Sequence, residues 1–176
     1  MMAEQIQVPE GLCRFIAATA VGPTTLRTMR GTKGSRPKLK RYFENFDLSQ
    51  VHPGDFFDAL DRWTNEISGF FEQPNWGAAR KAINLFLRDC AANWWLRRQY
   101  ALGDVEPAFE IPLDSRTMRR LNSEGRMGLK VIPAVSDLTP EESQEFQRVA
   151  SALAQPNRVD RVHLDYLYWP PTEVIP

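Results

Sequence analysis

The sequence predicts a mostly α protein, and three observations support that prediction. Several segments repeat apolar residues at three- and four-residue spacing, which is typical of helices with one buried face. Helix-capping residues precede three segments, at Asn75, Asp114 and Thr139. No convincing set of strands is visible. With 176 residues, of which 43% are hydrophobic and 11% aromatic, the chain has enough apolar material for one compact unit over residues 1–176.

The first third of the chain predicts two helices separated by a basic loop. An apolar segment from about residue 10 to residue 20 indicates a short buried helix, which Gly22 and Pro23 end. Residues 27–41 contain seven basic side chains and no acidic one, and glycine and proline interrupt them. We therefore expect a mobile basic loop there. Residues 53–71 carry aromatic and aliphatic residues at helical spacing, with acids on the opposite face, and predict the second helix.

The middle of the chain predicts a long helix over residues 76–102. Asn75 can cap its first turn, and Gly103 lies near its end. Its apolar stripe includes Ile83, Phe86 and Leu87, and Lys81 falls on the other side of that stripe. Lys81 is therefore expected to lie outside the core.

The last third predicts an extended segment followed by three helices. Residues 105–114 are broken by proline and lead to Asp114, which can cap a helix over residues 115–124. A helix over residues 138–155 has Thr139 as its cap, with Pro140 and Glu142 in its first turn. A final helix covers residues 158–169.

Composition excludes several functional classes. The formal net charge is zero, so overall charge does not indicate a nucleic-acid or membrane partner, although the basic residues are concentrated in residues 27–41 and in the 76–102 helix. The two cysteines suit buried free thiols in a reducing cytosol, and no cysteine cluster is present to bind a metal cluster. The N-terminal apolar run is too short to span a membrane. We expect a cytoplasmic protein with no cofactor.

Common catalytic motifs are also missing. His52 and His163 are the only histidines, and the sequence contains no HExxH, GxSxG or glycine-rich phosphate loop. A single histidine in the final helix, His163, is more often structural than catalytic. Metal catalysis and hydrolase triads are therefore disfavoured.

Two segments remain, "GAARKAINLFL" and "PLDSRTMRRL", and together they resemble the paired signature of the helix-hairpin-helix DNA glycosylase superfamily, which includes the endonuclease-three-like enzymes. Five residues follow the order of the family's hairpin-helix motif: Gly77, Arg80, Lys81, Asn84 and Leu87. Leu113, Asp114, Ser115 and Arg116 follow its aspartate motif. The stretch between Lys81 and Asp114 is longer than in the commonest branch, and in this it is similar to the archaeal oxidised-guanine glycosylase branch.

The resemblance implies an enzyme that removes a modified base from duplex DNA and cleaves the strand. Lys81 would be the nucleophile that forms a Schiff base, and Asp114 would stabilise positive charge on the sugar. Contacts to the phosphates of the DNA backbone would come from seven residues: Gly77, Ala79, Arg80, Arg36, Lys38, Lys40 and Arg116. The displaced base would stack on an aromatic residue, for which the candidates are Trp76, Trp94, Trp95 and Tyr100.

The same resemblance implies two lobes, one from about residue 24 to residue 113 and one formed by residues 1–22 with residues 114–170. An alternative stays open. Taken singly, Lys81 is typical of a solvated lysine and Asp114 of a simple helix cap. The family's second hairpin glycine is Ala79 in this chain. That replacement favours a non-catalytic helical protein that binds nucleic acid or a protein partner.

Overall fold

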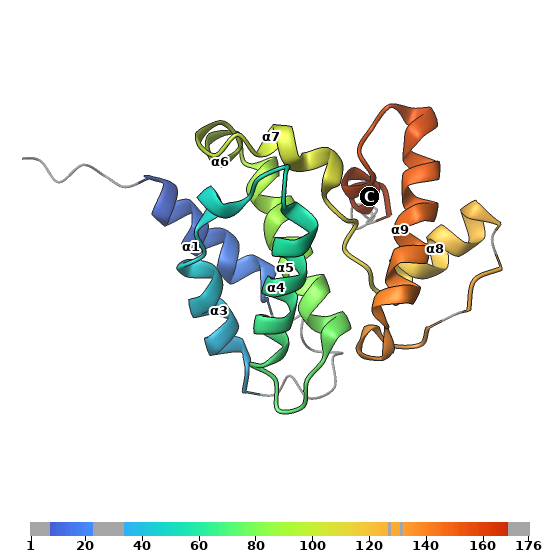
Figure 1. Ribbon diagram of the computed structural model, residues 1–176, viewed down its shortest axis with the longest axis horizontal. Coiled ribbons are helices and arrows are strands. Elements are labelled where there is room, and N and C mark those ends of the chain that lie inside the picture. Colours follow the sequence, from blue (N-terminus) through green and yellow to red (C-terminus); the bar gives the residue numbers. More distant parts are fainter. Residues whose placement is uncertain (1–7, 23–33, 127, 131, 169–176) are drawn as a thin grey trace, which may run out of the picture.

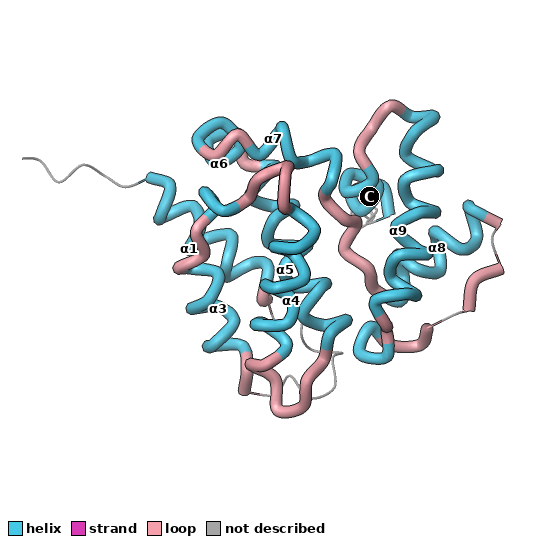
Figure 2. The backbone as a smooth tube through the Cα atoms, in the orientation of Figure 1, coloured by secondary structure: helices cyan, strands magenta, loops and turns pink. Residues whose placement is uncertain are grey.

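A computed structural model describes residues 8–22, 34–126, 128–130 and 132–168 (Figure 1). Within these ranges the protein is all-α, as the sequence predicts: nine α-helices and five short 3-10 helices are present, and no strand (Figure 2). The longer α-helices are α1 (Val8–Ala20), α3 (Arg36–Glu44), α4 (Phe56–Ser68), α5 (Trp76–Ala92), α8 (Ser115–Gly125) and α9 (Pro140–Ala154). The shorter ones are α6 (Trp94–Gln99), α7 (Leu102–Val105) and α10 (Leu164–Tyr168).

The helices form two groups, which lie on the left and on the right of Figure 1. In the first group α4 packs against α5, and α1 packs against both α3 and α5. In the second group α8 packs against α9, and α10 contacts α8. For residues 8–22, the described part of residues 1–22, the expected lobe assignment is therefore wrong. The apolar face of α1, with Cys13, Ile16 and Ala17 buried, joins the first group and not α8–α10.

Aromatic packing holds the first group together. Phe43 of α3 and Phe86 of α5 are fully buried and stack with ring centroids 4.6 Å apart. Phe46 contacts both Phe86 and Trp63 edge to face. Large aromatic side chains bury the most apolar area per residue, so these contacts are a major source of stability. Helix α4 forms where its aromatic spacing predicts, with Phe56 and Trp63 buried.

The single helix expected over residues 76–102 is divided into α5 and α6, and α7 begins only at Leu102. Helix α5 ends at Ala92 because Asn93 leaves the helical backbone conformation and its side chain accepts hydrogen bonds from the N–H groups of Trp95 and Leu96. Asn93 is thus the N-cap of a new helix, α6. The change of direction places Trp94 and Trp95 on the surface, with 65% and 45% exposure. Trp94, which falls on the apolar stripe of the expected single helix, is therefore not buried.

Two further expectations are corrected. The basic segment over residues 27–41 is helical from Arg36 onward, because Pro37 lies in the first turn of α3, where a proline is compatible with a helix. Its residues 27–33 lie outside the described part of the chain. The final helix is also shorter than expected, since residues 161–163 form a 3-10 turn before α10.

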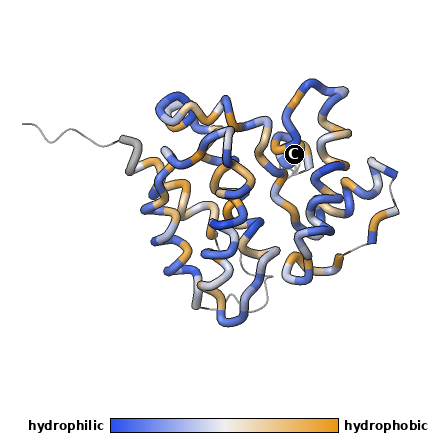
Figure 3. Tube along the Cα trace, viewed as in Figure 1, coloured by the Kyte–Doolittle hydropathy of each residue, from blue (hydrophilic) through white to orange (hydrophobic). Residues whose placement is uncertain are grey.

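The predicted caps of the second group are confirmed. The Asp114 side chain accepts from the N–H groups of Arg116 and Thr117 at the start of α8. Thr139 and Glu142 form a reciprocal capping box at the start of α9. No described helix is long and apolar enough to cross a membrane, and Figure 3 shows hydrophobic residues interrupted by hydrophilic ones along the helices.

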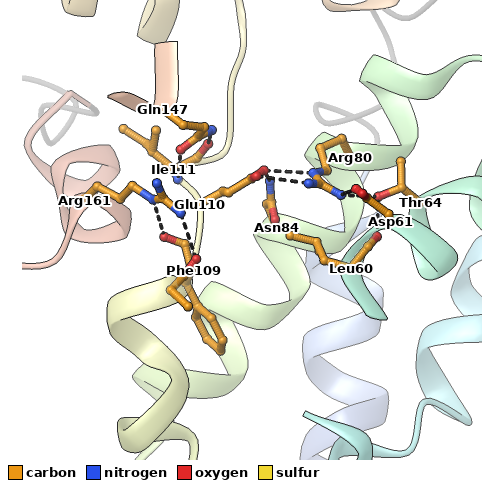
Figure 4. A network of polar contacts seen from close by, with 11 residues as sticks. Leu60, Asp61, Thr64, Arg80, Asn84, Phe109, Glu110, Ile111, Gln147 and Arg161 are labelled. Atoms are coloured by element: carbon orange, nitrogen blue, oxygen red, sulfur yellow. Dashed lines mark hydrogen bonds and ion pairs between the residues drawn. The ribbon is translucent and has the colours of Figure 1, made fainter. Parts of the chain in front are cut away.

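The extended segment over residues 109–113 joins the two groups. The backbone of Ile111 exchanges two hydrogen bonds with the Gln147 side chain of α9, at 2.9 and 3.0 Å. The Arg161 guanidinium donates to the carbonyls of Phe109 and Ala108 at 2.8 Å (Figure 4). These bonds satisfy backbone groups that no helix or sheet pairs. They hold the second group of helices against this segment.

Candidate functional site

Lys81 lies in the second turn of α5, which Asn75 caps through a hydrogen bond from the N–H of Ala78. Its side chain is 11% exposed and extends toward the second group of helices, where its Nζ donates to Oδ2 of Asp114 at 3.3 Å. Lys81 is outside the hydrophobic core, as expected. It is not a solvated surface lysine, however, because most of its side chain is buried.

Both carboxylate oxygens of Asp114 accept hydrogen bonds. Oδ1 accepts from the N–H groups of Arg116 and Thr117, each at 2.9 Å, and Oδ2 faces Lys81. Burial alone would raise its pKa, but the Lys81 charge and the backbone donors outweigh burial, and the pKa of Asp114 is lowered. The cap of α8 thus provides a fixed negative charge 3.3 Å from a primary amine.

Both groups line one cavity of about 270 Å³. Its walls come from α5, from α1 through Thr19 and Ala20, from Pro112 of the extended segment, and from α10. We call it the Lys81–Asp114 cavity. Residues far apart in the sequence therefore meet at a single concave site, which is the arrangement that the paired motifs require.

Sequence reasoning missed the opposite wall of this cavity. Asp165 of α10 is 1% exposed, and Arg88 of α5 forms a short ion pair with it. The Arg88 guanidinium also lies 5.1 Å from the centre of the Tyr166 ring. Burial raises the pKa of Asp165 to about 6, although Arg88 opposes the shift; the charge of Asp114 adds to it. One feature of the sequence could have indicated this wall: Asp165 is an acidic residue among apolar neighbours in the last helix.

Three of the residues expected to contact DNA are buried within the protein: Gly77, Ala79 and Arg80. A Cβ atom built on Gly77 would come within 1.9 Å of the carbonyl oxygen of Val135, so this glycine permits close packing between α5 and the segment before α9. Ala79 is fully buried. The hairpin start of α5 therefore contacts protein at these positions instead of a phosphate.

Arg80 is the centre of a buried polar network (Figure 4). Its guanidinium binds both oxygens of Glu110, at 2.8 and 3.0 Å, and also donates to Asp61 and Thr64. Asn84 donates to the same Glu110 carboxylate at 3.0 Å. Two positions of the hairpin-helix motif, Arg80 and Asn84, thus stabilise the fold, because both bind the buried carboxylate of Glu110 in the extended segment.

The remaining expected DNA contacts lie on the surface. Arg36, Lys38, Lys40 and Arg116 are exposed. Arg36 donates to the carbonyl of Val21 at 3.1 Å, and Lys40 pairs with Glu44 at 3.5 Å. Helix α3 therefore presents a basic surface that includes Lys38, and Arg116 lies at the start of α8, two residues after Asp114.

None of the four aromatic residues expected to hold a base lines the Lys81–Asp114 cavity, so they form no base pocket there. Trp76 packs beneath the Arg80 guanidinium, with 5.3 Å between the guanidinium carbon and the ring centre. Trp94 and Trp95 are exposed on α6. Tyr100 lies beside Cys13 and Phe46 at another depression. The aromatic residue at the cavity is Tyr166.

Outside this cavity, Glu106, Asp160 and His163 bring one ligand atom each to within 4.8 Å of one another. The two oxygens of Glu106 are already engaged, one by Arg97 and the other by Nε2 of His163 at 3.3 Å. This arrangement supports the structural role expected for His163.

Comparison with protein families, with curated proteins and with solved structures finds no match to this chain. The function proposed below therefore depends on the geometry of the site and on the two motifs.

Proposed function

We propose that this protein is a DNA glycosylase with lyase activity, similar in mechanism to the helix-hairpin-helix enzymes, and that it removes a modified base from duplex DNA. The observation that carries the proposal is the approach of the Lys81 amine to the Asp114 carboxylate, 3.3 Å, at the wall of a cavity between two groups of helices. A nucleophile and a fixed carboxylate at one concave site are the minimum equipment for this reaction.

The chemistry divides between the two residues. After Lys81 gives up a proton, its nitrogen attacks C1′ of the nucleotide; the glycosidic bond breaks, and its electron pair leaves with the base, which then takes up a proton. The sugar carries positive charge in the transition state, and the ionised Asp114 stabilises that charge. The nitrogen then loses a proton and the ring oxygen takes one up as the C1′–O4′ bond breaks, which leaves a protonated Schiff base. Removal of a proton from C2′ forms a C2′–C3′ double bond, the C3′–O bond breaks, and the 3′ phosphate leaves, which cleaves the strand.

Access to the cavity requires the base to leave the DNA helix. Lys81 is 11% exposed at its side chain and cannot reach a sugar within an intact stack, so a flipped nucleotide must enter the cavity. Tyr166 is the aromatic residue at the cavity wall, and the Arg88 guanidinium lies over its ring. The exposed basic residues of α3 and Arg116 supply positive charge that attracts the phosphates of the DNA backbone.

Borohydride trapping tests the proposal, because it reduces a Schiff base to a stable amine between protein and DNA. Duplexes with oxidised guanine, uracil, an alkylated base or an abasic site would be incubated with the wild type, with Lys81→Gln and with Asp114→Asn. We expect an adduct with at least one duplex, its loss in Lys81→Gln, and slower formation in Asp114→Asn. The exposed Lys130 provides the matched control, since Lys130→Gln should form the adduct normally.

A second candidate is a non-catalytic protein that binds nucleic acid or a protein partner. The close packing of Gly77 against Val135 favours it, because this start of α5 is covered by protein. Absence of both adduct and base release on every duplex, with correctly folded wild-type protein, would reject the glycosylase proposal. Retained DNA binding in that experiment would support the second candidate.

A further inference from the structure

A second cavity of about 370 Å³ lies where the starts of α4, α5 and α9 converge, and it shares no lining residue with the Lys81–Asp114 cavity. We call it the α4–α5–α9 cavity. Two aromatic rings line it, Phe57 of α4 and Trp76 of α5. Phe57 is 53% exposed although it is a large apolar residue. Exposed aromatic surface at a concave site is typical of ligand binding.

A buried hydroxyl at this cavity lacks a partner. Ser143 of α9 lines the cavity and is 2% exposed, and its Oγ has no hydrogen-bond partner among the described residues. Buried polar atoms are nearly always paired in folded proteins, because an unpaired one has lost its water without compensation. A ligand that hydrogen-bonds to Ser143 would supply the missing partner.

The charges at the cavity restrict the ligand. Arg80 is paired with Asp61 and Glu110, and Arg161 donates to two backbone carbonyls, so neither is available to bind an anion deep in the cavity. Arg148 is different. Its side chain is 76% exposed, and its contact with Glu145 spans 3.7 Å, so its charge can be shared with a ligand at the outer edge.

From these features we infer that the α4–α5–α9 cavity binds an unstacked nucleotide, with the base against Phe57 and Trp76, a hydrogen bond to Ser143, and the phosphate near Arg148. A nucleobase combines a flat π face with edge donors and acceptors, and its phosphate carries the charge that Arg148 attracts. The nucleotide is either free or part of a single strand. The inference does not depend on the chemistry proposed for Lys81.

Calorimetric titration of the full-length protein with adenosine 5′-monophosphate, and separately with a single-stranded oligodeoxyadenylate of about ten nucleotides, tests the inference. We expect saturable binding of at least one probe. Phe57→Ala should weaken binding about tenfold, since stacking on one aromatic ring has that order of effect. Phe15→Ala removes another exposed aromatic residue, on α1, and should leave binding unchanged.

Ser143→Ala distinguishes a serine that binds ligand from one that only stabilises the fold. Because the hydroxyl is unpaired in the free protein, its removal should leave the melting temperature equal or higher while nucleotide binding weakens. Binding of the mononucleotide alone identifies a free nucleotide as the ligand, and preference for the oligonucleotide identifies a strand. Failure of both probes to bind, or binding that is unaffected by Phe57→Ala and Ser143→Ala, overturns the inference.

Discussion

Asp165 is the buried acid whose charge state in this fold depends most clearly on pH. Its pKa rises from 3.8 to about 6, first because of burial and despite the opposing charge of Arg88. A pKa above the unfolded value means that the folded state binds more protons, so this group stabilises the protein fully below the unfolded pKa. That contribution is lost as the pH rises through about 6.

Asp165→Asn should therefore change how stability depends on pH. Relative to the variant, the wild type should lose about 2 kcal/mol of unfolding free energy between about pH 4 and about pH 7. Urea denaturation of both proteins at these two pH values measures the difference. Glu145→Gln, at an exposed site on α9, is the control and should give a nearly constant difference. A constant difference for Asp165→Asn as well would contradict the burial argument.

Arg80 provides the second prediction for a single residue. Arg80→Ala would leave the buried Glu110 without its cationic partner, and removal of one member of a buried pair typically costs about 3–5 kcal/mol of unfolding free energy. Arg116→Ala, at an exposed position, should cost much less. Denaturant titration of the two variants measures these losses. If Arg80 served only as a DNA contact, as the motif predicts, both variants would lose similar small amounts of unfolding free energy.

At the scale of the helix, Gly77 determines how closely α5 approaches the segment before α9. Gly77→Ala places a Cβ atom 1.9 Å from the Val135 carbonyl, so we expect a loss of about 1–3 kcal/mol in unfolding free energy, or more if the backbone cannot shift. Gly11→Ala in α1 is the matched control, because nothing lies within 4 Å of its Cβ and alanine favours a helix. Equal stability of the two variants would argue against close packing at Gly77.

Asp114 combines a helix cap with the proposed chemistry, and two substitutions separate these roles. Asparagine caps helices about as well as aspartate, so Asp114→Asn should retain most of the stability that the cap provides. Asp114→Ala should lose about 1 kcal/mol more. Both should impair base removal, because neither carries the charge. If Asp114→Asn retained wild-type activity, the carboxylate would have no role beyond capping.

At the scale of the whole molecule, zero net charge means that the proposed DNA binding must depend on a local basic surface. Lys38 is exposed on α3, next to residues that the sequence identified as basic. Lys38→Ala should reduce the slope of log affinity against log salt by about 0.9 if it contacts one phosphate. Lys130→Ala is the control for a lysine outside α3. A slope unchanged by Lys38→Ala would exclude α3 from the proposed DNA surface.

Local patterns predicted the helical class, the start of α5 at Asn75, the caps at Asp114 and Thr139, and the position of α4. The division of the 76–102 helix was missed because a single residue, Asn93, changed conformation within a sequence that is otherwise favourable to helices. The site was predicted in part. Lys81 and Asp114 were identified, whereas Asp165 and Tyr166 were not, because their importance arises only when α10 packs beside α5.

The sequence by itself determined the helical elements and their caps, because spacing of apolar residues and hydrogen bonds of capping side chains act within a few neighbouring positions. Only the tertiary structure decided which side of α5 is covered by protein, so that Arg80 is buried against Glu110 while Lys81, its neighbour, lines a cavity with Asp114. The physical reason is that burial and charge pairing depend on groups distant in sequence, here the extended segment and α10, whose approach no local pattern specifies.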